Sequence, residues 1–122
     1  MPRAFMGLVL VFAALLVAAC SSARYSLPTT EELRQTGRFS EPELESLEEG
    51  RIIGVTECAD CHRMYWPAEK PSEEWPGIMH AMADRSGLED ADVEHLSFYF
   101  SMVSDAVERN ELFWLPEPAT TP

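Results

Sequence analysis

Two cysteines and one histidine within five consecutive residues constrain this chain more than any other feature. Cys58 and Cys61 are three positions apart, and His62 follows directly. In a helical segment this spacing puts the two thiols about one turn apart, with the imidazole next to them. The fold must therefore bring two sulfur atoms and one ring nitrogen to the same place.

The segment Cys58-Ala59-Asp60-Cys61-His62 has the C-x-x-C-H pattern of covalent haem attachment. Two thiols at this spacing can add to the two vinyl groups on one edge of a haem, and the adjacent imidazole then lies under the iron. We therefore predict one haem c, bound covalently through Cys58 and Cys61, with His62 as the proximal ligand of the iron.

Residues 1–19 have the pattern of a secretory signal, with Arg3 followed by an apolar run. An uncleaved transmembrane anchor is the less favoured interpretation, because a helix that spans a bilayer needs about 20 residues and this apolar run is shorter. The segment Leu16-Val17-Ala18-Ala19-Cys20 resembles the lipobox of bacterial lipoproteins. This resemblance implies a lipid on Cys20, a periplasmic location on a membrane and, from Ser21, the outer membrane. A free or disulfide-bonded Cys20 is the alternative.

Three haem-free interpretations of the C-x-x-C-H segment remain. His80 or His95 could complete a zinc site of two cysteines and two histidines. A thioredoxin-like redox pair would need a strand-helix-strand context that this chain lacks, and a plain structural disulfide is the third interpretation. Export favours haem over all three, because it takes the motif to the compartment where bacteria assemble c-type haem.

The segments after the leader predict an all-α fold. Residues 20–40 are polar and suit a flexible, lipidated tether, with a short helix near residues 30–36 that a Thr29-x-x-Glu32 capping box would begin. Three core helices are expected, at about residues 41–55, 72–85 and 90–109.

Local signals suggest where these helices begin and end. Ser40 and Glu43 form a second capping box, Ser72 can cap the next helix, and Gly87 can end it. We expect the haem domain to span residues 41–115, with the apolar segment Leu112-Phe113-Trp114-Leu115 packed on it. A docking patch for a partner is the alternative for that segment. Residues 116–122 are expected to be a disordered tail.

The formal net charge is −12, which argues against nucleic acid as a partner. The acids are spread along the chain, and this pattern is typical of a solvated surface rather than of a single binding patch. Electrostatic steering toward a basic redox partner is the alternative interpretation.

A methionine opposite His62 would complete the coordination of the iron and raise its reduction potential. On a helix that begins near Ser72, we expect Met82 to lie centrally on the buried face and to be this ligand. Met79, Met102, His80 or a vacant sixth position remain as alternatives. The aromatic candidates for the haem pocket are Tyr65, Trp66 and Trp75.

Over residues 41–108 the chain resembles the small monohaem cytochrome c family. Besides C-x-x-C-H, it has Gly50 before Cys58 and the segment Leu96-Ser97-Phe98-Tyr99-Phe100, which is similar to the Leu-x-x-Tyr-Leu pattern of the family. The resemblance implies that the first and last core helices cross closely where Tyr99 lies against Gly50. Compact members have a Trp seven residues before the ligand Met, and this similarity again points to Met82.

These observations predict a cytochrome c-like bundle of three core helices around one covalent haem. The expected function is single-electron transfer between redox proteins, with the domain held at a membrane by its lipid. No enzymatic activity and no small-molecule substrate are expected. The alternative is a haem-containing sensor or a subunit of a larger oxidoreductase complex.

Overall fold

The computed structural model describes residues 27–58 and 64–113. The leader, Cys20, the motif residues 59–63 and the predicted tail lie outside this part of the chain. The described residues contain helices and no strand, so this part is all-α as predicted. The elements in chain order are α2 (Thr30–Gln35), α3 (Glu41–Thr56), η2 (Pro67–Glu69), η3 (Ser72–Glu74), α4 (Trp75–Ser86) and α5 (Asp90–Glu108).

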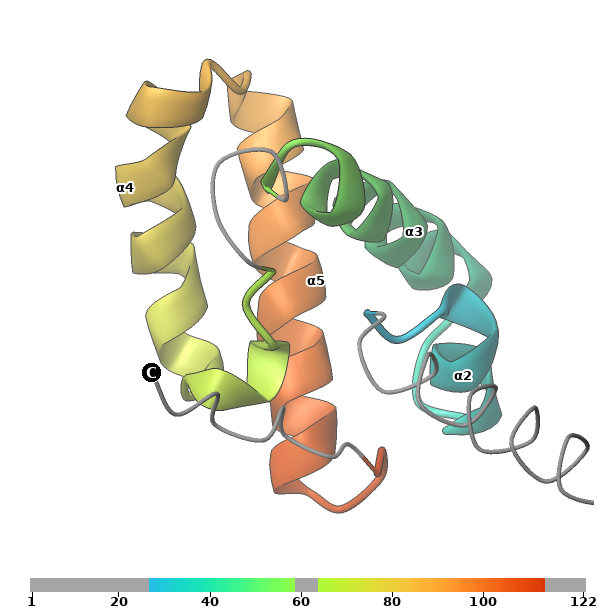
Figure 1. Ribbon diagram of the computed structural model, residues 1–122. Coiled ribbons are helices and arrows are strands. Elements are labelled where there is room, and N and C mark those ends of the chain that lie inside the picture. The colour runs from blue at the N-terminus through green and yellow to red at the C-terminus, as the bar shows by residue number, and fades with distance from the viewer. Residues whose placement is uncertain (1–26, 59–63, 114–122) are drawn as a thin grey trace, which may run out of the picture. The chain divides into compact units, whose positions relative to one another are not determined.

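Helix α5 lies at the centre of the arrangement. Helix α3 crosses it on one side, and α4 runs along it on another, connected to it by a short turn (Figure 1). The 3₁₀ turns η2 and η3 also contact α5, while α2 packs on α3. Helices that are distant in sequence therefore share one core, built around the apolar face of α5.

The predicted capping boxes are present. The carboxylate of Glu43 accepts hydrogen bonds from the backbone N–H of Ser40 at 2.8 Å and from its hydroxyl at 2.6 Å. These bonds lower the pKa of Glu43. At the start of α2, the carboxylate of Glu32 accepts from the N–H of Thr29 at 2.7 Å, and the Thr29 hydroxyl accepts from the N–H of Glu32 at 3.3 Å.

One predicted helix start is wrong. Ser72 does not cap α4 but begins the separate turn η3, and α4 starts at Trp75. The reason is Pro76, which has no N–H to donate and a φ angle that fits the first turn of a helix, so α4 begins immediately before it. Gly87 ends α4 as predicted, with a φ of 70° that suits glycine.

Helices α3 and α5 meet backbone to backbone at Gly50. A Cβ atom added at this glycine would overlap the carbonyl oxygen of His95 and would lie 2.7 Å from the Cβ of Tyr99. Gly50 is buried, and Tyr99 is completely so. No other amino acid fits here without moving the helices apart, so the glycine at position 50 is what allows α3 and α5 to cross this closely.

The domain begins earlier than predicted. The interpretation of residues 20–40 as a flexible tether is wrong for residues 27–40, because Leu27 and Leu33 are at most 1% exposed and belong to the same core cluster as α5. The hydroxyl of Tyr99 donates a 2.6 Å hydrogen bond to the carbonyl of Pro28 and holds this segment in place. Because residues 20–40 are mostly polar, their composition did not predict that Leu27 and Leu33 are buried.

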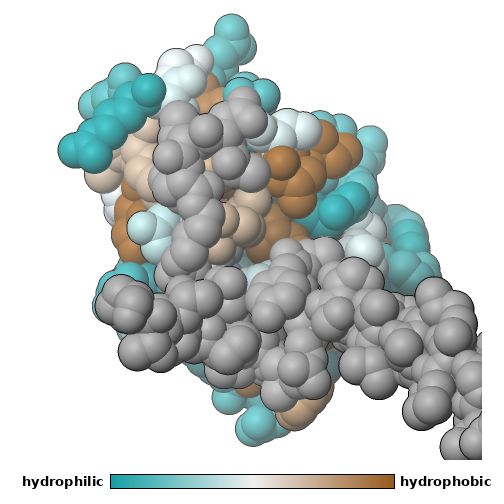
Figure 2. All heavy atoms as spheres, viewed as in Figure 1, coloured by the Kyte–Doolittle hydropathy of each residue, from teal (hydrophilic) through white to brown (hydrophobic). Residues whose placement is uncertain are grey.

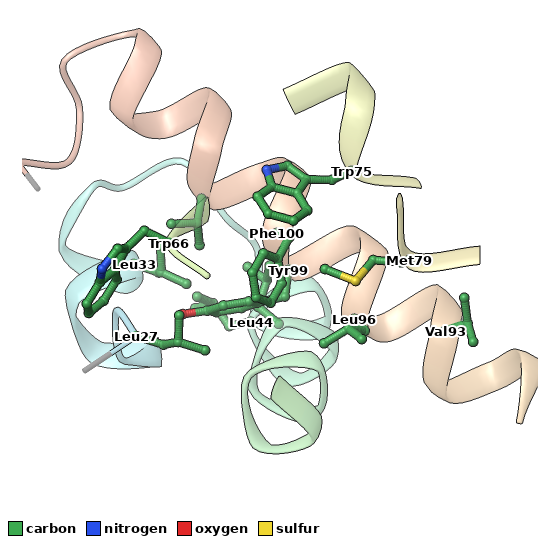
Figure 3. Close-up of a cluster of buried hydrophobic side chains, with 12 residues drawn as sticks. Leu27, Leu33, Leu44, Trp66, Trp75, Met79, Val93, Leu96, Tyr99 and Phe100 are labelled. Atoms are coloured by element: carbon green, nitrogen blue, oxygen red, sulfur yellow. The ribbon is translucent and has the colours of Figure 1, made fainter. Parts of the chain in front are cut away.

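Aromatic and aliphatic side chains fill the core (Figure 3). The rings of Trp75 and Phe100 are 4.7 Å apart between centroids, and Tyr99 meets Phe100 edge-on at 5.7 Å. Figure 3 shows the hydroxyl oxygen of Tyr99 on the side of the cluster where Leu27 lies. The centre of α5 therefore contacts both the N-terminal segment and α4.

Replacing Gly50 by alanine should destabilise the fold by about 3 kcal/mol, since the added methyl group meets backbone that cannot move alone. Gly77→Ala in α4 is the matched control, because nothing lies within 4 Å of its added Cβ. That change should stabilise the protein by about 0.5 kcal/mol. Urea unfolding followed by circular dichroism measures both, and equal stabilities of the two variants would contradict the close crossing.

Stability should also fall at alkaline pH because of Tyr99. Burial raises the pKa of this hydroxyl well above its usual value of about 10, so the folded protein keeps a proton that the unfolded chain releases. The stabilisation is complete below pH 10 and is lost as the pH rises further. Tyr99→Phe should cost about 1 to 3 kcal/mol at pH 7 and weaken this pH dependence.

Unfolding free energies of the wild type and of Tyr99→Phe, measured from about pH 9 to pH 11 at constant salt, test both expectations. A Tyr99→Phe protein whose stability falls as steeply as that of the wild type would show that another group titrates.

Candidate haem-binding site

The first motif residue directly follows α3. Helix α3 ends at Thr56, Glu57 caps it with helical dihedral angles, and Cys58 comes next. The side chain of Cys58 is half-buried and packs against the core cluster. Cys61 and His62 lie outside the described residues, as does the predicted lipid site Cys20. The described part of the site therefore consists of Cys58 and the elements around the core.

Helix α4 presents two neighbouring stripes of apolar side chains. Trp75 and Met79, four residues apart, are 1% and 2% exposed and form part of the core against α5. Ile78 and Met82 form the second stripe and are half-buried at the edge of the cluster. The expectation that Met82 lies centrally on the buried face is thus wrong, because the rotation of α4 puts Met79 there.

The second stripe borders a hollow of about 450 Å³. Apolar and aromatic side chains supply much of its lining, and this volume falls within the range of small-molecule and cofactor sites, which is about 300 to 1,000 Å³. The residues around it are Tyr65, Lys70, Glu74, Trp75, Ile78, Ala81, Met82 and Arg85. Met82 therefore borders space that a ligand could occupy, whereas Met79 is already packed in the core.

The three predicted pocket aromatics differ in burial. Trp66 is 2% exposed and Trp75 1%, while Tyr65 is 38% exposed and borders the hollow. The indole N–H of Trp75 donates a 2.8 Å hydrogen bond to the carbonyl of Pro67 in η2. This bond fixes the first turn of α4 against the segment that follows the motif.

The remaining ligand candidates lie elsewhere. Met102 on α5 is half-buried against the core. His80 is exposed, with Nε2 4.0 Å from a carboxylate oxygen of Glu94, and Nδ1 of His95 is 2.8 Å from the hydroxyl of Ser46. Among residues 27–58 and 64–113, no three His, Cys, Asp or Glu side chains gather closely enough to hold a metal ion.

A larger hollow of about 760 Å³ lies between α2 and α3, with charged side chains around it. Its two arginines are already paired: Arg34 with Glu31 and Glu41, and Arg51 with Glu48. The hydrogen bond from Arg51 is the main cause of the lowered pKa of Glu48. Seven of its eleven lining side chains are charged, compared with three of eight around the hollow beside Met82, so the hollow beside Met82 is the better cofactor candidate.

Apolar side chains reach the surface at both ends of the domain. Ile52 and Val55 on α3 are 42% and 40% exposed, and Phe113 is 84% exposed. Figure 2 shows brown apolar atoms between teal polar ones on one face. We expected the apolar segment 112–115 to pack on the domain. Leu112 packs on the core but Phe113 does not, while Trp114 and Leu115 lie outside the described residues.

No protein-family model matches the chain, and neither the curated proteins nor the solved structures contain a match to it. Within the described ranges, each helix is too short or too polar to cross a membrane.

Proposed function

We propose that this protein is a monohaem c-type cytochrome that carries single electrons between redox proteins while a lipid on Cys20 holds it at the periplasmic side of a membrane. It would not be an enzyme. In this proposal Cys58 and Cys61 bind the haem through thioether bonds, His62 is one axial ligand of the iron, and Met82 is the other.

The observation that carries the proposal is the position in the fold of Cys58, the first residue of the C-x-x-C-H motif. The motif begins directly after α3, and two turns earlier α3 crosses α5 at Gly50 and Tyr99. This combination of motif, glycine and tyrosine is the one that the resemblance to the cytochrome c family implies. The close crossing gives the motif a rigid start, because α3 cannot shift along α5 without a clash.

The surroundings of Met82 support its proposed role. Its side chain is half-buried and borders a hollow that both apolar and charged side chains line, with Trp75 and Ile78 among the apolar ones. A weakly hydrated thioether suits haem iron, and a Met/His pair raises the reduction potential. Met79 would have to leave the core to act as a ligand, at a cost of about 2 to 5 kcal/mol if its packing were lost entirely.

When bound, the haem supplies an iron that cycles between Fe(II) and Fe(III) by taking up and releasing one electron. The contribution of the chain is to hold that iron in nearly constant coordination and to exclude water. The buried Trp75, held by its bond to Pro67, and the packed face of α5 provide the rigidity for this. Little rearrangement then accompanies each electron, which favours fast transfer between proteins.

Covalent haem attachment is the first test. The full chain, expressed in a host with a cytochrome c maturation system, should be red and should retain haem on a denaturing gel. Cys58→Ser together with Cys61→Ser should abolish the haem stain. A colourless wild-type protein from this host would contradict the proposal, and stoichiometric zinc in that protein would favour the metal-site interpretation.

The axial ligand can be identified by comparing two variants of α4. Met82→Ala should remove the sulfur-to-iron charge-transfer band of the oxidised protein and lower its reduction potential, because the thioether would be lost. Met79→Ala should keep the band but cost about 2 to 5 kcal/mol of stability, since it opens a cavity in the core.

The other outcomes of this comparison would change the assignment of the axial ligand or the proposed function. Loss of the band in Met79→Ala, with the band retained in Met82→Ala, would reassign the ligand to Met79. Tight binding of carbon monoxide by the reduced wild type would contradict a stable Met ligand, and it would favour the sensor alternative over electron transfer.

A further inference from the structure

Two basic side chains border the hollow beside Met82, and neither forms an ion pair with any described residue. Lys70 lies between η2 and η3, and Arg85 lies in the last turn of α4. Every other Lys or Arg side chain in the described part of the chain forms a salt bridge with a carboxylate; these are Arg34, Arg38, Arg51 and Arg109. The described cations whose charge no salt bridge balances therefore both lie at the same hollow.

This hollow is an exception in a strongly acidic chain. The sequence has 21 acidic and 9 basic residues, so most basic side chains have a carboxylate within reach. Among the described residues that line the hollow, only Glu74 is acidic, while Lys70 and Arg85 are basic. The lining therefore carries a net positive charge, whereas the whole chain has a formal net charge of −12. Such a lining attracts an anion.

The same hollow, of about 450 Å³, has an apolar wall on α4. Ile78, Ala81 and Met82 are three or four residues apart and share one stripe of the helix, and Arg85 follows Met82 by three residues at the end of that stripe. Lys70 comes from the chain that precedes α4. The apolar stripe therefore has a basic residue beyond each end, and a ligand that fits it has both an apolar part and a negative charge.

We propose that the hollow beside Met82 binds an apolar group that carries a carboxylate, and that Arg85 and Lys70 bind the carboxylate charge. Arg85 is the stronger partner, because a planar guanidinium can donate two parallel hydrogen bonds to a carboxylate. Lys70 contributes less, since the negative charge of Glu74, which also precedes α4, offsets part of its own.

Two sources could supply this ligand chemistry. Haem is an apolar ring with carboxylate side chains, so a haem in the hollow would have its carboxylates bound by these cations; that source rests on the proposed function. A free amphipathic carboxylate is the other source, and it does not depend on haem. The experiments below distinguish the two.

A purely structural role is the alternative for Arg85. A cation in the last turn of a helix interacts favourably with the negative end of the helix dipole. That role predicts that Arg85→Gln lowers the stability of the protein and leaves ligand binding unchanged. Binding affinity is therefore the measurement that separates the two roles, and unfolding temperature is not.

Isothermal titration calorimetry of the full chain with naphthoate tests for the free-carboxylate site. Naphthamide keeps the rings but has no charge, so it should bind more weakly than naphthoate. Arg85→Gln should weaken naphthoate binding about tenfold, and Lys70→Gln should weaken it by less. Glu74→Gln should strengthen it, because the lost carboxylate repels the ligand. The three altered side chains are exposed, so these variants should fold.

Two further variants are the controls for charge. Arg85→Lys keeps the positive charge and should bind naphthoate more tightly than Arg85→Gln does. Arg34→Gln removes a cation from the other hollow, where Glu31 and Glu41 pair with it, and should leave the affinity unchanged.

If haem fills the hollow, naphthoate should not bind to the red protein, and the reduction potential becomes the measurement. Spectroelectrochemical titration should then show a lower midpoint potential in Arg85→Gln, because a positive charge near the iron disfavours the ferric state. Glu74→Gln should raise the potential for the opposite reason. Arg85→Lys should stay close to the wild type, and Arg34→Gln should have a far smaller effect than Arg85→Gln.

The outcomes separate this inference from the proposed function. Naphthoate binding that depends on Arg85 supports a free carboxylate as the ligand, and it can be measured even if the protein is colourless and the proposed function fails. A red protein whose potential follows the charges at positions 74 and 85 supports haem as the source. If Arg85→Gln changes neither the affinity for naphthoate nor the potential, the inference is wrong, while a red wild type would leave the haem proposal standing.

Discussion

The close crossing of α3 and α5 is the constraint on which the rest of the structure depends. Because Gly50 has no side chain, the backbone of α3 reaches the carbonyl of His95 and the Cβ of Tyr99. This contact fixes where α3 ends relative to α5, and hence where Cys58 begins the motif. It also brings the ring of Tyr99 under the N-terminal segment, where its hydroxyl reaches the carbonyl of Pro28. The absence of a side chain at Gly50 thus determines the relative positions of α3, α5 and the N-terminal segment at Pro28.

The bond between Trp75 and Pro67 makes a similar connection on the other side of α5. It ties the start of α4 to the turn after the motif, and the indole also packs on Phe100. The hydroxyl of Ser104 on α5 donates to the carbonyl of Lys70 at 2.7 Å and holds the same loop. The segments on both sides of the motif are therefore anchored to α5, so a group held between them would be held rigidly.

The sequence was sufficient to predict the helices, because their caps and apolar periodicity are local signals. Thr29, Ser40 and Gly87 act where their patterns predict. The contact between Gly50 and Tyr99 was also predictable, but only through the resemblance to a family. In contrast, the axial rotation of α4 depends on how Trp75 and Met79 fit α5, so periodicity alone could not tell which methionine is buried. The burial of Leu27 depends on its packing at Gly54, which is distant in sequence: a Cβ atom added to Gly54 would lie 3.1 Å from Cδ1 of Leu27.

If Cys20 carries a lipid as proposed, the early start of the domain limits how far the domain could move from a membrane. Leu27 is fixed in the core, so only the segment after Cys20 separates a lipid on that cysteine from the folded part. Even fully extended, these residues reach about 25 Å, far less than a tether running to residue 40 would. A domain tethered in this way would sample partners within a thin layer, where collisions would occur mainly by lateral diffusion. An electron donor or acceptor would then have to share that layer.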